Sequence, residues 1–239
     1  MNFLSDTVVV IPAWNEEKTI KGIIHQIRAT TTYDIIVVDD ASTDHTAEEA
    51  MVAGAHVLPL AFNLGAWVAT QTGIRYAVKK RYKYLITMDA DGQHLPTAIP
   101  GLLKPLWDGA ADVVIGSCVK RGSRARMLAW SFFRRLTGLD INDLTSGFKA
   151  YNLQALLLLS TNQASLLEYQ DIGVLLLLRR AKMRIMEVEV PMCPRESGSS
   201  KIFGSWIKVG QYMLLNIILS LSHATFFFPR SNNSAGEIE

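Results

Sequence analysis

The sequence predicts an α/β protein, built on a mostly parallel central sheet with helices on both faces. Three observations indicate this fold. Short apolar segments alternate with helical patterns through the first half of the chain. The segments are apolar along their whole length, as is typical of strands covered on both faces. Polar and acidic residues directly follow several of them, where parallel sheets place their functional groups.

Five strands and four helices are predicted in order along this half. The strands cover residues 7–11, 35–38, 56–60, 84–88 and 112–116. The helices cover residues 16–29, 46–54, 66–80 and 98–107. The run Ser42-Thr43-Asp44 supplies capping side chains for the second helix. This strand–helix order favours parallel crossover connections.

The second half is less regular. Residues 143–151 have a strand-like pattern, residues 169–181 predict a leucine-rich helix, and residues 183–192 alternate as a strand does. The segment 120–138 carries six basic side chains, which are either the solvated face of an amphipathic helix or cations that face phosphates. We expect one or two of the six to contact a ligand. They are Lys120, Arg121, Arg124, Arg126, Arg134 and Arg135.

An apolar segment, residues 202–228, lies near the C-terminus and is long enough to be considered as a membrane span. Polar residues such as Lys208 and Asn216 interrupt it, so we expect an amphipathic helix instead, either on a membrane surface or packed on the domain. The predicted organisation is therefore a main domain over 1–201, this helix over 202–228, and a flexible tail over 229–239.

The composition excludes several classes of protein. Of 239 residues, 49% are hydrophobic and 19% are charged, which excludes a disordered chain. A net charge of +2 gives no electrostatic reason to expect nucleic-acid binding. Two cysteines without a zinc-type or disulfide-rich pattern, and an N-terminus without signal-peptide features, favour a cytoplasmic location.

Two acidic pairs follow predicted strands: Asp39-Asp40, and Asp89 with Asp91. Like charges this close repel each other unless a cation neutralises them, and oxygen ligands suit Mg²⁺ or Mn²⁺. The alternative is a polar turn around Asp91-Gly92. Because the carboxyl ends of parallel strands meet at one edge, the convergence of two pairs favours a functional site.

Seven segments match one known family in order and spacing. They are VVVIPAWNEE (8–17), IIVVDDASTDHT (35–46), NLGAWVATQTGIRYA (63–77), MDADGQHLP (88–96), DVVIGS (112–117), DLTSGFKAYN (143–152) and EVEVPMCPRESGSSKI (187–202). This set resembles the family-two glycosyltransferases of GT-A fold, especially the dolichol-phosphate mannose synthases and polyprenyl-phosphate glycosyltransferases. The resemblance implies an inverting, metal-dependent enzyme. It would move a sugar from a UDP- or GDP-linked donor to a polyprenyl or dolichyl phosphate.

The resemblance also implies roles for residues at the donor. Asp89 and Asp91 match the family's metal motif, with Gln93 as a third oxygen ligand, and the Mg²⁺ or Mn²⁺ would neutralise the departing diphosphate. His94 is expected to be structural or to support a ligand, because these ions prefer oxygen. The nucleotide-sugar would lie near Pro12, Ala13, Glu16, Asp39, Asp40 and Asp89, with Lys120 or Arg121 on its phosphates.

On the acceptor side, Arg195, Ser200 and Lys201 match the family's R-x-x-G-x-S-K segment, which contacts phosphates; an exposed polar linker is the alternative. Arg134 is expected to bind the acceptor phosphate as well. A lipid phosphate is already anionic and needs no strong base, so Asp143 would orient it or act as the base. A sugar hydroxyl would require a base, and the candidates are then Asp143 and Asp171.

Other functions remain open. The acceptor could instead be a sugar hydroxyl of a surface polysaccharide or lipid-linked glycan, or the protein could bind nucleotide-sugars without catalysis. Trp67 stands where the group often has a glycine, so contacts to the sugar or base are expected to differ there. We expect no paired C-terminal membrane helices, so a lipid acceptor would require peripheral contact at the cytoplasmic face or a membrane partner. A homo-oligomer also remains open.

Overall fold

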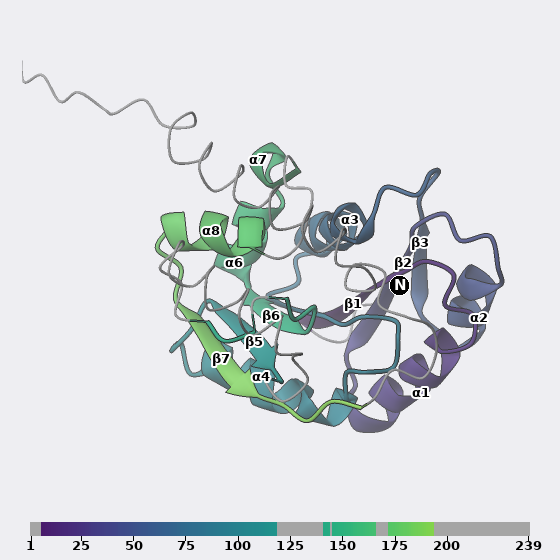
Figure 1. Cartoon of the computed structure of the whole chain (residues 1–239), viewed down its shortest axis with the longest axis horizontal. Helices are drawn as coiled ribbons and strands as arrows, with labels where there is room; N and C mark the ends of the chain where they lie inside the picture. The colour runs from purple at the N-terminus through teal and green to yellow at the C-terminus, as the bar shows by residue number, and fades with distance from the viewer. Residues whose placement is uncertain (1–5, 119–140, 144, 166–171, 194–239) are drawn as a thin grey trace, which may run out of the picture. The chain divides into compact units, whose positions relative to one another are not determined.

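A seven-stranded sheet organises residues 6–118, 141–143, 145–165 and 172–193, which are the residues that the computed structural model describes (Figure 1). The strands are β1 (Thr7–Ala13), β2 (Asp34–Asp39), β3 (His56–Pro59), β4 (Tyr84–Thr87), β5 (Val113–Ser117), β6 (Lys149–Asn152) and β7 (Ile185–Glu189). Their order is β3-β2-β1-β4-β6-β5-β7. Only β6 runs antiparallel to its neighbours. The predicted mostly parallel sheet is confirmed.

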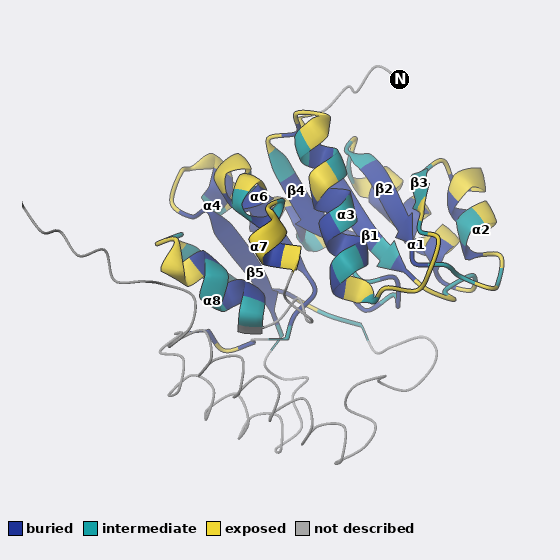
Figure 2. Ribbon diagram, turned by 90° about the horizontal axis from the view of Figure 1, so that it is seen from above, coloured by how far each residue is buried: buried dark blue, intermediate teal, exposed yellow. Residues whose placement is uncertain are grey.

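Helices cover both faces of this sheet (Figure 2). One face carries α1 (Ile20–Thr30), α2 (Thr46–Val52), the short 3-10 helix η1 (Pro96–Ala98) and α4 (Ile99–Trp107). The other carries α3 (Ala66–Lys79), α6 (Leu153–Leu159), α7 (Asn162–Ser165) and α8 (Ile172–Arg180). Helix α3 packs so closely that a Cβ on Gly73 would lie 2.4 Å from Val10 Cγ1. The strands β1, β2, β4 and β5 are therefore buried on both sides, which explains why they are mostly apolar.

The direction in which the strands are added reverses beside β1. Strands β2 and β3 extend the sheet on one side of β1, whereas β4 begins on the other side. Such a switch point leaves a crevice outside the carboxyl ends of the strands. Asp39-Asp40 and the segment 89–93 follow β2 and β4, so they share this edge. Because β6 is antiparallel, the residues that precede it, 145–148, lie at the same edge.

The prediction of a strand over residues 143–151 was wrong in extent, because β6 begins only at Lys149. The residues before it bond to one another instead: Thr145 N donates to Asp143 Oδ1 and Phe148 N to Ser146 Oγ. Local bonds of this kind compete with a β-ladder. Helix α6, which the sequence analysis did not predict, starts directly after β6. It is capped by Asn152, whose side-chain oxygen accepts from Ala155 N at 3.0 Å.

Two predicted segments, residues 120–138 and 202–228, fall outside the described residues, and the predicted domain boundaries remain predictions. The helix predicted over 169–181 is described from Ile172 onward as α8. Within the described part of the chain, no helix is both long enough and apolar enough to cross a bilayer.

Candidate active site

Two loops at the carboxyl ends of β1 and β2 are joined by hydrogen bonds between side chains and backbone. Asn15 N donates to Ser42 Oγ at 3.0 Å, and Thr43 N donates back to Asn15 Oδ1 at 2.8 Å. Three more bonds of this type join residues 16–17 to residues 44–46. Pro12, Ala13 and Glu16 were predicted to contact a nucleotide at this edge. The two loops there are held together by the protein's own hydrogen bonds.

Asp39 ends β2 and Asp40 follows it, and the two have different partners. Both oxygens of Asp40 accept backbone N–H groups, from Leu64 at 2.7 Å and Gly65 at 2.9 Å. Asp40 therefore fixes the loop that leads into α3. Among the hydrogen bonds described for the Asp39 carboxylate there is only a longer one, which it accepts from Ser42 N at 3.3 Å. Of this pair, Asp39 is the better suited to bind a ligand.

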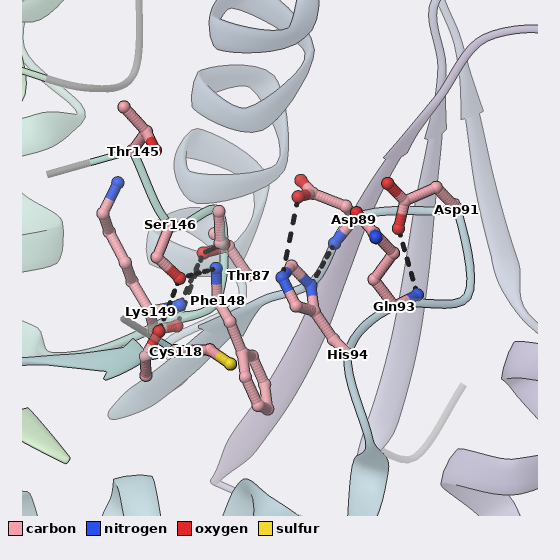
Figure 3. A network of polar contacts seen from close by, with 12 residues as sticks. Thr87, Asp89, Asp91, Gln93, His94, Cys118, Thr145, Ser146, Phe148 and Lys149 are labelled. Atoms are coloured by element: carbon pink, nitrogen blue, oxygen red, sulfur yellow. Dashed lines mark hydrogen bonds and ion pairs between the residues drawn. The ribbon is translucent and has the colours of Figure 1, made fainter. Parts of the chain in front are cut away.

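The loop after β4 carries Asp89, Asp91 and Gln93 (Figure 3). Gln93 N donates to Asp91 Oδ1 at 3.1 Å, which closes the turn. At the N-cap of α1, Thr19 Oγ1 donates to the carbonyl of Ala90 at 2.6 Å. Gln93 O accepts from Cys193 N, beyond β7, at 3.0 Å. Contacts from the start of α1 and from the segment beyond β7 therefore define the shape of this loop.

His94 lies between Asp89 and Phe148 (Figure 3). Its Nδ1 accepts from Asp89 N at 3.1 Å, and its Nε2 is 3.7 Å from Asp89 Oδ2. The imidazole stacks on the Phe148 ring with centroids 4.9 Å apart. The residue that the sequence suggested as structural or supporting thus contacts the first acid of the metal motif.

Asp143 is held at this edge by Glu187 of β7. The Glu187 carboxylate accepts from Asn142 N and Asp143 N, each at 2.8 Å, and from Asn142 Nδ2 at 2.9 Å. The Asp143 carboxylate in turn accepts from Thr145 N and, at 3.4 Å, from Cys118 N. Sequence analysis did not single out Glu187, because its only signal was the strand alternation around it.

Trp67, at the position where contacts to the sugar or base were expected to differ, is held inside the protein. Its side chain is 2% exposed, and its Nε1 donates to the carbonyl of Ala164 at 2.9 Å. One helical turn later, Gln71 Nε2 donates to Leu159 O at 2.9 Å. The two residues tie α3 to α6 and α7, so Trp67 is structural.

Nine predicted site residues are described, and the fold brings them all to one sheet edge. They are Pro12, Ala13, Glu16, Asp39, Asp40, Asp89, Asp91, Gln93 and Asp143. The others lie outside the described residues, and their roles remain predictions: Lys120, Arg121, Arg134, Arg195, Ser200 and Lys201, together with Asp171 as the alternative base.

The oxygen-rich donor set fits a hard divalent cation. In the described ranges, no three His, Cys, Asp or Glu side chains come together as a metal cluster. Mg²⁺ typically takes only one or two protein carboxylates and completes its shell with phosphate oxygens and water. Two carboxylates and one amide in the segment 89–93 are consistent with that pattern.

Comparison with known proteins decides the family. Residues 8–154, more than half of the chain, match the sequence profile of Glycosyl transferase family 2. The chain belongs to this family. It is 32% identical to an undecaprenyl-phosphate mannosyltransferase of Micrococcus luteus over 82% of this chain and 87% of the relative. It is 30% identical to a polyprenol monophosphomannose synthase of Mycolicibacterium smegmatis over 86% and 84% of the two chains. The protein is thus a glycosyltransferase, as the sequence predicted.

A solved structure shows the same fold. Glucosyl-3-phosphoglycerate synthase from Mycobacterium tuberculosis, in complex with Mn²⁺, uridine-diphosphate and phosphoglyceric acid, superimposes with a TM-score of 0.69 at 23% identity. The match covers 94% of this family-2 chain and 80% of the synthase. The predicted GT-A fold class is confirmed.

Proposed function

We propose that this glycosyltransferase moves a sugar from a nucleotide-sugar to a polyprenyl phosphate, with a divalent cation bound and with inversion at the anomeric carbon. The observation that carries the proposal is the position of the segment 89–93. It follows β4 at the switch point of the sheet, beside the joined loops of β1 and β2. The names of the two bacterial relatives support the lipid-phosphate acceptor.

The donor nucleoside would lie over the ends of β1 and β2. Asp39 can accept a hydrogen bond from a ribose hydroxyl or a base N–H. The surrounding loops need little ordering when the donor binds, because their own hydrogen bonds already hold them. A preformed site of this kind loses less entropy on binding.

Asp89, Asp91 and Gln93 would hold the Mg²⁺ or Mn²⁺. When bound, such an ion neutralises the charge that develops on a departing diphosphate. The protein's own contribution is orientation, since Thr19 and Cys193 fix the loop that carries all three ligands.

A polyprenyl phosphate brings an oxygen that is already anionic near neutral pH, so the reaction needs little general-base catalysis. Asp143, held through Glu187, would orient this acceptor. Cations from Arg134, Arg195 and Lys201, with the Ser200 hydroxyl, would neutralise and align its phosphate. The enzyme would work in the cytoplasm, against the membrane surface, with residues 202–228 making the peripheral contact.

The test is transfer by the full-length chain. GDP- and UDP-linked sugars are supplied with undecaprenyl phosphate, with Mn²⁺, with Mg²⁺ or with EDTA, and both nucleoside diphosphate and lipid-linked sugar are measured. We expect transfer with one donor, its loss in EDTA, and at least a 100-fold fall for Asp91→Ala, as for other groups that stabilise transition-state charge. Asp108→Ala, which removes an exposed acid at the C-cap of α4, is the matched control.

Three outcomes would contradict the proposal. Full transfer by Asp91→Ala would refute the metal assignment. Transfer to a sugar hydroxyl but not to undecaprenyl phosphate would refute the acceptor. Donor binding without turnover on either acceptor would indicate a non-catalytic nucleotide-sugar-binding protein.

A further inference from the structure

We propose that His94 is a positioning residue that sets the orientation of the Asp89 carboxylate for cation binding. The inference rests on the proposed function, because it takes Asp89 to be a metal ligand. Its own observation is that both ring nitrogens of His94 face the same residue, one toward the backbone of Asp89 and one toward its side chain (Figure 3).

The hydrogen bond to the backbone fixes where the ring carries its proton. Nδ1 accepts from Asp89 N at 3.1 Å, so the ring hydrogen is on Nε2. The Nε2–H group faces Asp89 Oδ2 at 3.7 Å, a separation too long for a direct hydrogen bond. It therefore acts as an oriented dipole that favours one placement of the carboxylate. Groups that orient a ligand in this way raise metal affinity without touching the ion.

The ring itself has little freedom to move. His94 is 2% exposed, and its imidazole stacks on Phe148 at an interplanar angle of 16°. The backbone of His94 forms an antiparallel bridge with Met192. A ring fixed by stacking and by its own backbone can transmit orientation, whereas a mobile ring could not.

Gly147 limits the space available to the Asp89 carboxylate on another side. A Cβ at Gly147 would lie 2.3 Å from Asp89 Oδ1 and 2.6 Å from Oδ2, so the carboxylate rests directly on the glycine backbone. Even so, the side chain of Asp89 remains 36% exposed. Asp89 is therefore confined by His94 and Gly147 yet accessible to an ion from solvent.

The alternative is that His94 only fills the core. That role predicts lower stability on substitution and unchanged metal affinity. The positioning role predicts weaker metal binding, whatever happens to the melting temperature. Measuring the two quantities separately therefore distinguishes the roles.

The experiment uses the full-length protein and Mn²⁺ alone, with free Mn²⁺ followed by electron paramagnetic resonance and melting temperature measured in EDTA. His94→Phe keeps an aromatic ring on Phe148 but removes both nitrogens, and we expect Mn²⁺ affinity to fall about 10-fold. His94→Gln places an N–H group near the position of Nε2 and should recover most of that loss. His56→Phe, which changes a histidine whose ring centroid lies 5.1 Å from that of Tyr76 in another part of the sheet, should bind Mn²⁺ as the wild type does.

Wild-type Mn²⁺ affinity in His94→Phe would overturn the inference, even if that variant melted at a lower temperature. If His94→Phe does not fold, His94→Asn takes its place, because its amide reaches only the position of Nδ1; unchanged affinity there overturns the inference equally. Transfer by a wild-type protein that binds no Mn²⁺ would refute this inference and the metal part of the proposed function, leaving the transfer itself. Weakened Mn²⁺ binding in the variants of a protein that transfers nothing would support the inference and refute the function.

Discussion

Removing the Glu187 carboxylate should lower activity, because this carboxylate holds the backbone of Asp143 at the proposed site. Glu187 accepts three N–H groups, two from the backbone of Asn142 and Asp143 at 2.8 Å and one from the Asn142 side chain at 2.9 Å. A hydrogen bond to a charged group contributes about 1.5–3 kcal/mol, so three together set an upper limit of roughly 5–9 kcal/mol. Glu187 is only half-buried and water can replace part of these bonds, so we expect Glu187→Ala to lower the free energy of unfolding by about 2 kcal/mol.

The expected effect on catalysis is larger than the effect on stability. Without Glu187, Asp143 loses the bond that fixes its backbone, and a shift of about 1 Å in a positioned group can reduce the rate about 100-fold. Glu187→Gln keeps one acceptor oxygen and should fall between wild type and alanine in both measurements. Urea denaturation gives the stability, and initial rates of lipid-linked sugar formation give kcat/KM.

Glu48→Ala provides the matched control, because Glu48 is an exposed acid paired only with His45 among the described contacts. It should leave both measurements unchanged. The reasoning fails if Glu187→Ala transfers sugar at the wild-type rate, because Asp143 would then need no support. It fails equally if Gln and Ala at this position behave alike, since the oxygen acceptor would then be irrelevant.

Two further predictions concern stability away from the chemistry. The side-chain hydrogen bond from Arg184 lowers the pKa of Asp112 to about 2. The stability that Asp112 contributes is therefore present above its unfolded pKa near 4 and is lost as the pH falls from 4 toward 2. Because Arg184 is half exposed, Asp112→Asn should lower the free energy of unfolding by only about 1–2 kcal/mol at pH 7. The variant should also lose less stability than the wild type between pH 4 and 2, as measured by urea denaturation across that range. Trp67→Phe should lower the free energy of unfolding by about 1–3 kcal/mol, because the carbonyl of Ala164 loses its buried N–H partner. The KM for the donor should stay unchanged in steady-state assays, and a raised KM would show that Trp67 also affects donor binding.

The sequence predicted the elements whose signal is local. The strands β1, β2, β4 and β5 are short apolar runs that end in turns or acids, and such runs are covered on both faces in a parallel sheet. The acidic pairs could be assigned to one edge because that geometry follows from parallel strands alone. Helix α6 was missed because LQALLLL is apolar at nearly every position, and periodicity cannot separate a buried helix from a strand in so short a run.

The roles that the sequence could not predict depend on contacts between distant parts of the chain. Trp67 contacts a carbonyl 97 residues away, and the bond from Asp143 to Glu187 spans 44 residues. When only the neighbouring sequence is known, a tryptophan in place of a glycine suggests a change in the ligand site. Once the fold is known, the burial of Trp67 assigns it to packing.

The same distinction separates structural acids from candidate functional acids. Asp40 has each oxygen occupied by a backbone N–H group of the loop before α3, so a ligand could bind it only by displacing part of the protein's own structure. Asp89 has its backbone N–H and its carboxylate oriented by His94, yet its side chain remains one-third exposed. A carboxylate that is oriented but still accessible can exchange water for a cation at little cost in reorganisation. This contrast favours Asp89 over Asp40 as the carboxylate that would bind the proposed cation.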